Sequence, residues 1–599
     1  MAIALAIVVA LPFFINMLLR PAGGTYLGIQ FATDDNMVYA AWMKQAMSGH
    51  FLFDNRFTTD AQPGLTFHFY FLLLGWVAKI LGIAFTLTFA RMVFSGLFVW
   101  LLYHLVRRTL HDGYTQKLAL ALVTLGGGIG FLVWHQFGQA FVRESPLSGP
   151  MLGRLPTDVW QTEGFVFPSM LENGLFMASL CLIVGIFVCV LDARESWRPV
   201  PFGALAFLTL MNIHSYDVLL VALVLIGFLV TALVNRTATG LWIARVVVMA
   251  LGVVPAALWF LHVLHEDTVF QARAATETYT SNFRQILVGY ILLIGLGLYG
   301  MWKGRALLGD PTNPRRSVIG ISALGLLLLE LYVLAGDHLK GYWMMMPVWT
   351  MFIAVMIALA VALRTADDGP NLILSWALVG LAAPYFPALF QRKLMMGLSV
   401  PWALLAAVGL SAILGARERG MRNLVAICGL ALLCGTSLQW FFRDISLARM
   451  NVSNTTVHPV YLSADAAEIV AKLDAVAGDR TVVLAMPGAA APLGPDSFAT
   501  PYLPDLNPIM SGLAGVYTYA GHWSETPDYN RRRTEASMFF VRMSDEDRHA
   551  FLADKKINYV IAPAPSAFPQ IPELTDLKSL GEVVFSGPQF TLIKIAPRT

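Results

Sequence analysis

Long apolar runs dominate the first three quarters of the chain. A transmembrane helix needs about 20 apolar residues, and the chain has runs of roughly that length one after another. They lie at about 2–19, 85–105, 117–135, 167–190, 201–213, 217–235, 241–264, 285–302, 317–336, 341–364, 371–390, 396–415 and 423–441, and 201–213 is short for a span. The pattern therefore predicts a polytopic α-helical membrane protein with about 13 transmembrane helices.

The pattern changes at residue 444, where charges return and Pro, Asp and Gly interrupt the apolar runs. Alternating helix-like and strand-like segments follow. We expect helices at 463–476, 529–542 and 544–555, strands at 481–486, 515–520 and 558–564, a loop at 487–512 and a hairpin at 583–595. The chain is thus predicted to comprise a membrane domain, 1–443, and an α/β domain with a partly parallel sheet, 444–599.

Composition agrees with a membrane protein. Hydrophobic residues make up 57% of the chain and charged residues 13%, whereas about a quarter of an ordinary soluble domain is charged. The net charge is only +3 and no dense basic run occurs. Nucleic acid is therefore excluded as a partner, and the lipid bilayer is expected.

The side of the membrane on which each loop lies depends on the segment 63–82. If this segment is an interfacial helix, the short loops with Arg107 and Arg108, Arg194, Arg245 and Arg422 all become cytoplasmic, as the positive-inside rule requires. Counting 63–82 as a span would reverse every later loop. The odd number of spans then places the terminal domain outside the cytoplasm.

The first outer loop, 20–62, carries the most informative polar residues. Asp34 and Asp35 follow the first span directly, Tyr39 comes four residues later, and Gly49 precedes a Pro-led apolar helix. This arrangement resembles the GT-C superfamily of membrane glycosyltransferases, and is most similar to its protein mannosyltransferase and aminoarabinose transferase branch. Asp34 and Asp35 also have a structural alternative, because Asp residues commonly cap helix N-termini.

The resemblance implies both a fold and a reaction. A GT-C enzyme would move a monosaccharide from a polyprenyl-phosphate donor to a glycan, lipid or protein acceptor at the outer face of the cell (inner) membrane. Asp35, with Asp34 beside it, matches the position of the catalytic base, and Tyr39 would lie in the substrate site. Two close carboxylates suit a general base, because their repulsion raises one pKa, and they also suit a divalent metal.

Other outer loops supply further candidate residues. Asp158 and Glu163 precede a span and are candidate acceptor or metal ligands, or surface charges. The sequence leaves open whether Mg or Mn binds, with Asp34, Asp35, Asp158 and Glu163 as candidate ligands.

Two more loops hold candidate polar groups. His214 and Asp217 are three residues apart and can contact a sugar, or simply reach water from a turn. Arg392, Lys393 and Lys340 stand at predicted outer helix ends, where cations suit the donor phosphate or lipid headgroups.

The terminal domain contributes a loop at 520–533 that is rich in chemically capable side chains. His522, Trp523 and Glu525 combine an aromatic ring with titratable groups, a combination that suits a carbohydrate. We expect this loop to cover the membrane site. An exposed loop without a ligand is the alternative.

Two other classes of function remain open at this point. A lipid or sugar transporter or flippase with a substrate-binding outer domain is the principal alternative. Charges in the middle of the spans, which transporters often use, are scarce here. The other is a non-catalytic assembly or receptor protein that acts through its outer domain.

Overall fold

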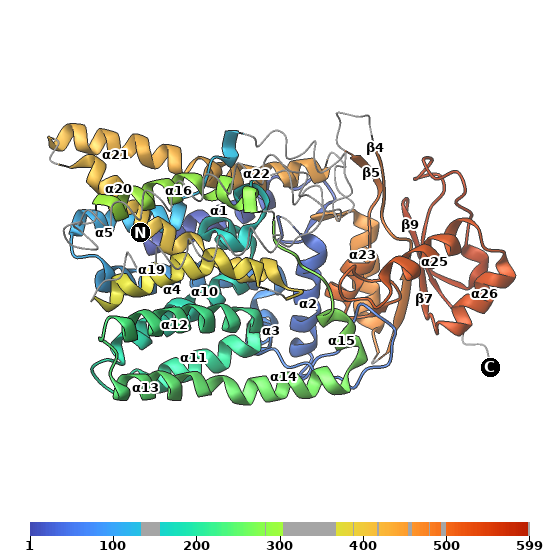
Figure 1. The fold of residues 1–599 in the computed structure, drawn as a ribbon. Helices are drawn as coiled ribbons and strands as arrows, with labels where there is room; N and C mark the ends of the chain where they lie inside the picture. Colours follow the sequence, from blue (N-terminus) through green and yellow to red (C-terminus); the bar gives the residue numbers. More distant parts are fainter. Residues whose placement is uncertain are drawn as a thin grey trace. The chain divides into compact units, whose positions relative to one another are not determined.

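The computed structural model describes residues 1–30, 32–132, 156–281, 283–303, 367–386, 388–415, 418–452, 458–478, 480–492 and 499–596 (Figure 1). Its contacts form two compact units. The first comprises Met1–Val9, Arg91–Leu258 and Glu277–Phe442. The second comprises Ala10–Ala90, Trp259–Thr276 and Arg443–Thr599.

Helices make up the first unit. They are α4 (Ile83–Thr109), α5 (Gly113–Leu125), η1 (Gly130–Leu132), α8 (Thr157–Trp160), η2 (Thr162–Gly164), α9 (Val166–Glu172), α10 (Gly174–Asp192), α11 (Val200–Ile213), α12 (Ser215–Val234), α13 (Gly240–Ala250), η3 (Leu251–Val253), α14 (Val254–Glu266), α16 (Phe283–Lys303), α19 (Asp368–Ala382), η4 (Ala383–Tyr385), η5 (Gln391–Met395), α20 (Ser399–Leu414), α21 (Arg419–Leu433) and α22 (Gly435–Val452). Some of them continue into the second unit.

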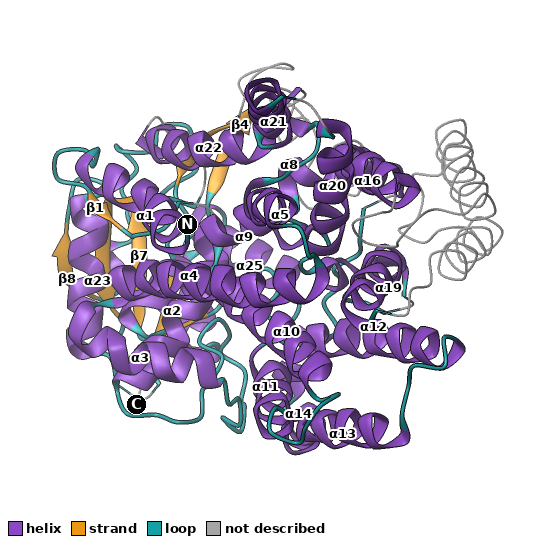
Figure 2. Cartoon of the chain, turned by 90° about the vertical axis from the view of Figure 1, so that its left-hand side faces the viewer, coloured by secondary structure: helices purple, strands orange, loops and turns teal. Residues whose placement is uncertain are grey.

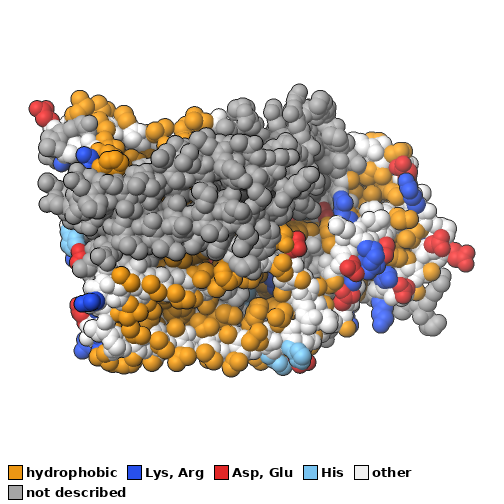
Figure 3. Space-filling view, in the orientation of Figure 1, with side chains coloured by type: hydrophobic (Ala, Val, Ile, Leu, Met, Phe, Trp, Pro, Cys, Tyr) orange, Lys and Arg blue, Asp and Glu red, His pale blue; other side chains and the backbone are white. Residues whose placement is uncertain are grey.

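Within the described residues, six helices are long and apolar enough to cross a membrane. Apolar side chains cover the visible surface of α11, α12 and α13 (Figure 3), as expected for helices that face lipid. Helix α3 (Phe69–Leu81) has 13 residues and is about 20 Å long. It is therefore too short to cross a hydrocarbon core of about 30 Å. The predicted spans 317–336 and 341–364, and the end of 117–135, lie outside the described residues.

The end of the membrane domain differs from the sequence prediction. The predicted span 423–441 is two helices, α21 and α22, bent by 50°. The predicted boundary at 444 falls inside α22, which continues to Val452. Arg443 Nη2 lies 2.7 Å from Asp444 Oδ1, and both side chains are buried. This pairing neutralises the two charges that suggested a boundary and lets the helix continue.

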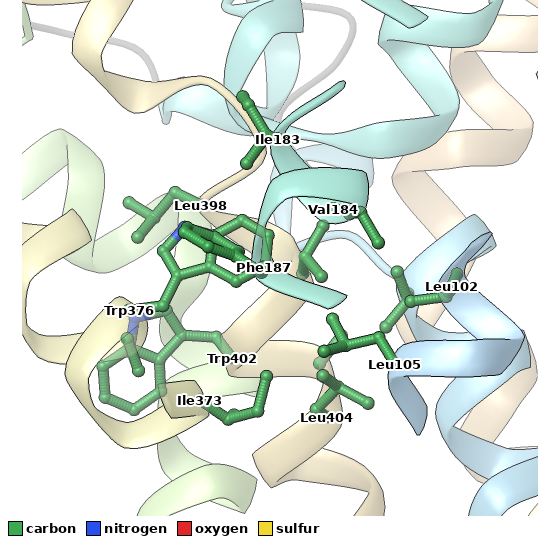
Figure 4. Packing of buried hydrophobic residues seen from close by; sticks show 14 of the residues in the cluster. Leu102, Leu105, Ile183, Val184, Phe187, Ile373, Trp376, Leu398, Trp402 and Leu404 are labelled. Carbon is green, nitrogen blue, oxygen red and sulfur yellow. The ribbon is translucent and has the colours of Figure 1, made fainter. Parts of the chain in front are cut away.

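Large aromatic side chains form the core of the first unit. Phe187 of α10 meets Trp376 of α19 edge-to-face at 4.9 Å between ring centroids, and Trp402 of α20 lies beside them (Figure 4). Helices α16 and α20 approach to backbone contact at Gly300 and Gly409, where an added Cβ on Gly409 would lie 1.9 Å from a carbonyl oxygen of α16. Small residues permit such close packing between helices.

The basic loops of the first unit gather at one end of its helices. Arg108 pairs with Asp192 at 2.7 Å and Arg194 with Asp368 at 2.5 Å. Arg245 donates to the Ala193 carbonyl. These contacts bring the loops of Arg108, Arg194 and Arg245 together, and their cytoplasmic side stays a prediction.

A five-stranded sheet forms the centre of the terminal domain (Figure 2). Its strand order is β6 (Tyr517–Thr518), β3 (Val482–Ala485), β7 (Tyr559–Pro563), β9 (Phe590–Lys594), β8 (Glu582–Ser586). Strand β3 is parallel to both β6 and β7, while β9 is antiparallel to β7 and β8. The prediction of a partly parallel sheet with a closing hairpin is confirmed.

The helices of this domain also match the sequence pattern. They are α23 (Ala464–Val476), α25 (Tyr529–Val541) and α26 (Asp545–Asp554), joined by the short α24 (Asn507–Ile509), η6 (Met510–Ala514) and η7 (Lys578–Leu580). Ser463 and Ser544 cap α23 and α26 through their side-chain oxygens. The predicted loop 487–512 instead contains a hairpin, β4 (Ala489–Pro492) and β5 (Ala499–Leu503).

The first outer loop packs on the terminal domain within the second unit, which also holds α1 (Ala2–Leu18) from Ala10 onward, α2 (Thr33–Met47), α3 and α15 (Thr268–Ala274). Strand β1 (Thr25–Tyr26) pairs with β2 (Tyr461–Leu462), and Lys44 of α2 pairs with Asp474 of α23 at 2.7 Å. An added Cβ on Gly512 would come within 2.7 Å of Met37 Sδ. The contacts therefore group the acidic loop with the terminal segment in the second unit, and the predicted division 1–443 and 444–599 stays a prediction.

Candidate functional site

The acidic pair begins helix α2. Ala32 is the N-cap, with φ of 46° and no side-chain capping bond. Asp34 and Asp35 instead occupy the first helical turn, where the helix dipole favours a negative charge. The capping alternative for this pair is therefore wrong. The Asp34 side chain is 16% exposed and that of Asp35 is 49% exposed, so Asp35 is the more accessible carboxylate.

Two histidines that follow the membrane helices face this pair. His522 Nε2 lies 3.2 Å from Asp35 Oδ1 and 3.6 Å from Asp34 Oδ2. His458 Nε2 lies 3.9 Å from the same Asp34 oxygen. The His522 side chain is only 1% exposed. The loop predicted to cover the acidic site thus contacts it within this unit.

The hydrogen bonds of His522 define which ring nitrogen carries a proton. The Ser524 backbone N–H donates to His522 Nδ1 at 3.2 Å, so Nδ1 acts as an acceptor. The proton of the neutral ring is then on Nε2, toward the carboxylates. Burial lowers the pKa of His522, but the contact with Asp35 and the charges of Asp34, Asp35 and Glu525 outweigh burial and raise it.

Neighbouring residues of the loop 520–533 bind other parts of the same unit. Glu525 Oε1 lies 2.8 Å from Arg273 Nε, and the Glu525 carbonyl accepts from Asn55. The Arg273 guanidinium also lies over the Trp42 ring, 4.8 Å from its centroid. Glu525 is therefore neutralised by Arg273 and ties this loop to α2 and α15.

Two aromatic candidates flank the acidic pair. Tyr39 stacks on Phe71 of α3 at 4.8 Å between ring centroids, one turn after Asp35 on α2. Trp523 is half-buried next to His522, with ring centroids 5.8 Å apart.

A second charged cluster lies in the first unit. Lys393 Nζ is 2.9 Å from Glu163 Oε1, and Arg392 Nε is 3.5 Å from the same oxygen. Glu163 is 5% exposed, whereas Arg392 and Lys393 are 29% and 20% exposed. Arg392 Nε has no hydrogen-bond partner among the described residues. Two cations thus share one buried carboxylate. The cluster therefore has net positive charge, and its more exposed side is the side of Arg392 and Lys393.

The backbone around these cations differs from the prediction. Arg392 and Lys393 lie in the short 3₁₀ helix η5, and the long helix α20 begins only at Ser399. The helix N-terminus therefore does not supply the expected anion site at these residues. Burial raises the pKa of Glu163, but the charges of Lys393 and Arg392 exceed that effect and hold it at about 2.

His214 and Asp217 lie close to the cationic cluster. His214 Nδ1 is 2.8 Å from Asp217 Oδ2, which also accepts from the Ser179 hydroxyl. The ring of Phe176 lies 5.9 Å from the His214 ring and 5.6 Å from Lys393 Nζ. The structure therefore places His214 and Lys393 on either side of the Phe176 ring. Helix α10 carries Phe176 near one end and Asp192 of the basic end at the other, about 24 Å apart along the helix axis.

Asp158 is a buried anchor in the described part of the chain. It is 1% exposed, and its Oδ2 accepts from the backbone of Gly128 and Gly130 and from the Thr436 hydroxyl. Burial raises the pKa of Asp158 and outweighs these hydrogen bonds, which lower it, and the net result is a pKa raised to about 6. This position suits holding the 126–130 loop against α22 better than contact with an acceptor.

The expected roles of Lys340 and of a divalent metal stay predictions. Lys340 lies outside the described residues. Among the described residues, no three His, Cys, Asp or Glu side chains form a group able to hold a metal ion. No step proposed below passes through a metal. Sequence reasoning also missed His458, because its partner Asp34 is distant in sequence and the pair leaves no local pattern.

Of the comparisons with known proteins, the one with solved structures gave matches. No protein-family profile matches the chain, and no curated protein matches it. Among solved structures, it is similar to the crystal structure of ArnT from Cupriavidus metallidurans bound to undecaprenyl phosphate. The identity is 12% and the TM-score 0.42, over 100% of this chain and 98% of that one. A likeness at this level transfers no residue role, so the roles proposed below depend on this chain's own contacts.

Proposed function

We propose that this integral membrane protein is an inverting GT-C-type glycosyltransferase. It would move a monosaccharide from a polyprenyl-phosphate donor to an acceptor hydroxyl at the outer face of the cell (inner) membrane, where the terminal domain also lies. The observation that carries the proposal is the acidic pair of α2, with Asp35 half-exposed beside the buried His522. This combination offers an accessible carboxylate with an imidazole nitrogen 3.2 Å away.

Asp35 acts as the general base in this reaction. It takes the proton of the acceptor hydroxyl while that oxygen forms a bond to the anomeric carbon. The bond between the anomeric carbon and the phosphate oxygen breaks, and its electron pair leaves with the phosphate. Attack from the face opposite the leaving group inverts the anomeric configuration.

The cluster of Arg392, Lys393 and Glu163 suits the donor phosphate. The leaving polyprenyl phosphate gains negative charge as the bond breaks. Positive groups placed beforehand stabilise such developing charge. An Arg is well suited because its guanidinium can form two parallel bonds to a phosphate. Since Glu163 is buried, the cations present their more exposed side to an anion.

Replacement of Asp35 by Asn tests the proposal. The purified full chain in lipid nanodiscs is given a radiolabelled polyprenyl-phosphate sugar and a membrane extract as acceptor, and labelled product is measured. We expect Asp35→Asn to lose about 10²- to 10⁴-fold in rate, the usual contribution of a general base. Asp474→Asn removes a half-exposed carboxylate of α23 that pairs with Lys44, a residue of α2 like Asp35. This control variant should keep wild-type activity.

An active Asp35→Asn variant would contradict the proposed function. Wild-type turnover by a folded Asp35→Asn variant removes Asp35 from the role of base. Movement of the labelled lipid across proteoliposomes without any covalent product would favour the transporter alternative. A ligand-bound structure that placed Asp35 and Arg392 on opposite faces of the membrane would also contradict the proposal.

A further inference from the structure

His522 differs from the other groups around the acidic pair because it is almost fully buried and contacts both carboxylates. Its Nε2 lies within 3.6 Å of each, and the Ser524 N–H occupies Nδ1. The neutral ring therefore carries its proton on Nε2. The protonated ring keeps that proton and adds one on Nδ1. In either state Nε2 carries the hydrogen nearest Asp34 and Asp35, and among the described residues Nε2 has no partner that meets hydrogen-bond geometry.

The loop that carries His522 is itself held firmly. The Thr526 hydroxyl accepts from the backbone N–H groups of Gly521 and His522 and donates to the Phe57 carbonyl. Glu525 is held by Arg273. Contacts of the residues before and after His522 thus fix the backbone that carries the imidazole. The position of this loop therefore does not depend on the contacts of the ring alone.

We propose that His522 is a positioning residue for Asp35, so that the terminal domain forms part of the reaction centre. This inference rests on the proposed function. The Nε2–H group would hold Asp35 Oδ1 and favour the ionised carboxylate, which must be charged to accept a proton. The other groups that face this cluster are Asp34 and His458, which contact each other, and Glu525 from the His522 loop.

The test compares His522→Gln and His522→Phe with His549→Gln, a histidine on α26 of the same domain. Each full-length variant is assayed in nanodiscs for kcat, KM and the pH profile of kcat/KM, and thermal unfolding is recorded. We expect His522→Phe to lose about 10- to 100-fold in kcat, the range for a hydrogen bond to a charged group. The KM for the donor should change little.

The pH profile separates positioning from a merely structural role. Without the N–H group the carboxylate is ionised less readily, so the acidic limb of the His522→Phe profile should move to higher pH. His522→Gln supplies an amide N–H and should recover part of the rate and of the profile. His549→Gln should match wild type.

Each result has a defined meaning. Unchanged kcat and pH profile in folded His522→Phe, with Asp35→Asn inactive, would overturn this inference and leave the proposed function intact. Full activity in Asp35→Asn would instead overturn the proposed function. If His522→Phe does not fold, the decision falls to His522→Gln: a reduced kcat with a shifted acidic limb supports positioning, and a wild-type profile and rate contradict it.

Discussion

The two charged clusters use similar residue types in opposite ways. At the start of α2 two carboxylates meet imidazoles, and the more reactive position, Asp35, is 49% exposed. Around Glu163 one carboxylate meets two cations, and the carboxylate is only 5% exposed. The first cluster has negative charge in excess at its exposed side, and the second has positive charge in excess. Burial therefore decides which charged group a ligand can reach. In the α2 cluster this group is a carboxylate that can act as a base, and in the Glu163 cluster it is a pair of cations that can bind an anion.

Loss of both exposed cations should have the largest effect on donor binding. The double variant Arg392→Gln/Lys393→Gln should weaken binding of polyprenyl phosphate by about 100-fold or more, since each charged hydrogen bond contributes about 1.5–3 kcal/mol. Microscale thermophoresis in nanodiscs measures Kd. Asp35→Asn should keep the wild-type Kd, and so should Arg198→Gln, an exposed arginine in another loop. Equal losses in the Asp35 variant would remove the distinction between the two clusters.

Removal of the buried carboxylate should affect stability more than binding. Glu163→Gln leaves two partly buried cations without a counter-charge, so the free energy of unfolding should fall by about 2–4 kcal/mol. Phosphate binding should tighten several-fold because the carboxylate no longer competes. Unfolding in detergent and the Kd measure both effects. The exposed Glu195 provides a matched control as Glu195→Gln. A stable variant with weaker binding would show that Glu163 itself contacts the donor.

The pH dependence of the free energy of unfolding should have opposite signs in the two clusters. This is the smallest of the expected effects. The fold raises the pKa of His522, so its contribution is complete below about pH 6.5 and is lost as pH rises through the folded-state value. The fold lowers the pKa of Glu163 to about 2. The contribution of Glu163 is therefore complete above about pH 4.5 and is lost as pH falls toward 2.

Unfolding of wild type, His522→Gln and Glu163→Gln between pH 4 and 9 measures this contrast. The difference between wild type and His522→Gln should shrink on the alkaline side, by at most about 1.4 kcal/mol per pH unit. The difference for Glu163→Gln should stay constant there and shrink only below about pH 4.5. Parallel curves for the two variants would mean that these groups do not titrate as the structure implies.

Much of the fold could be predicted because its signals are local. Apolar runs identify the helices of the first unit, and alternating segments with Ser463 and Ser544 at helix starts identify the terminal domain. The predicted span 423–441 is bent in the structure, because Gly435 begins a new helix at an angle of 50°. The predicted boundary at 444 falls inside helix α22, where a buried ion pair between neighbours looks like surface charge in the sequence.

The sequence by itself determined the membrane class and the place of the acidic pair after the first apolar run. The tertiary structure alone decided that His522, nearly 490 positions later, faces Asp35, and that Glu163 neutralises part of the Arg392 and Lys393 charge. Periodicity and composition are properties of neighbouring residues. Charge pairing depends on distances in space between segments far apart in sequence, and no local pattern records them.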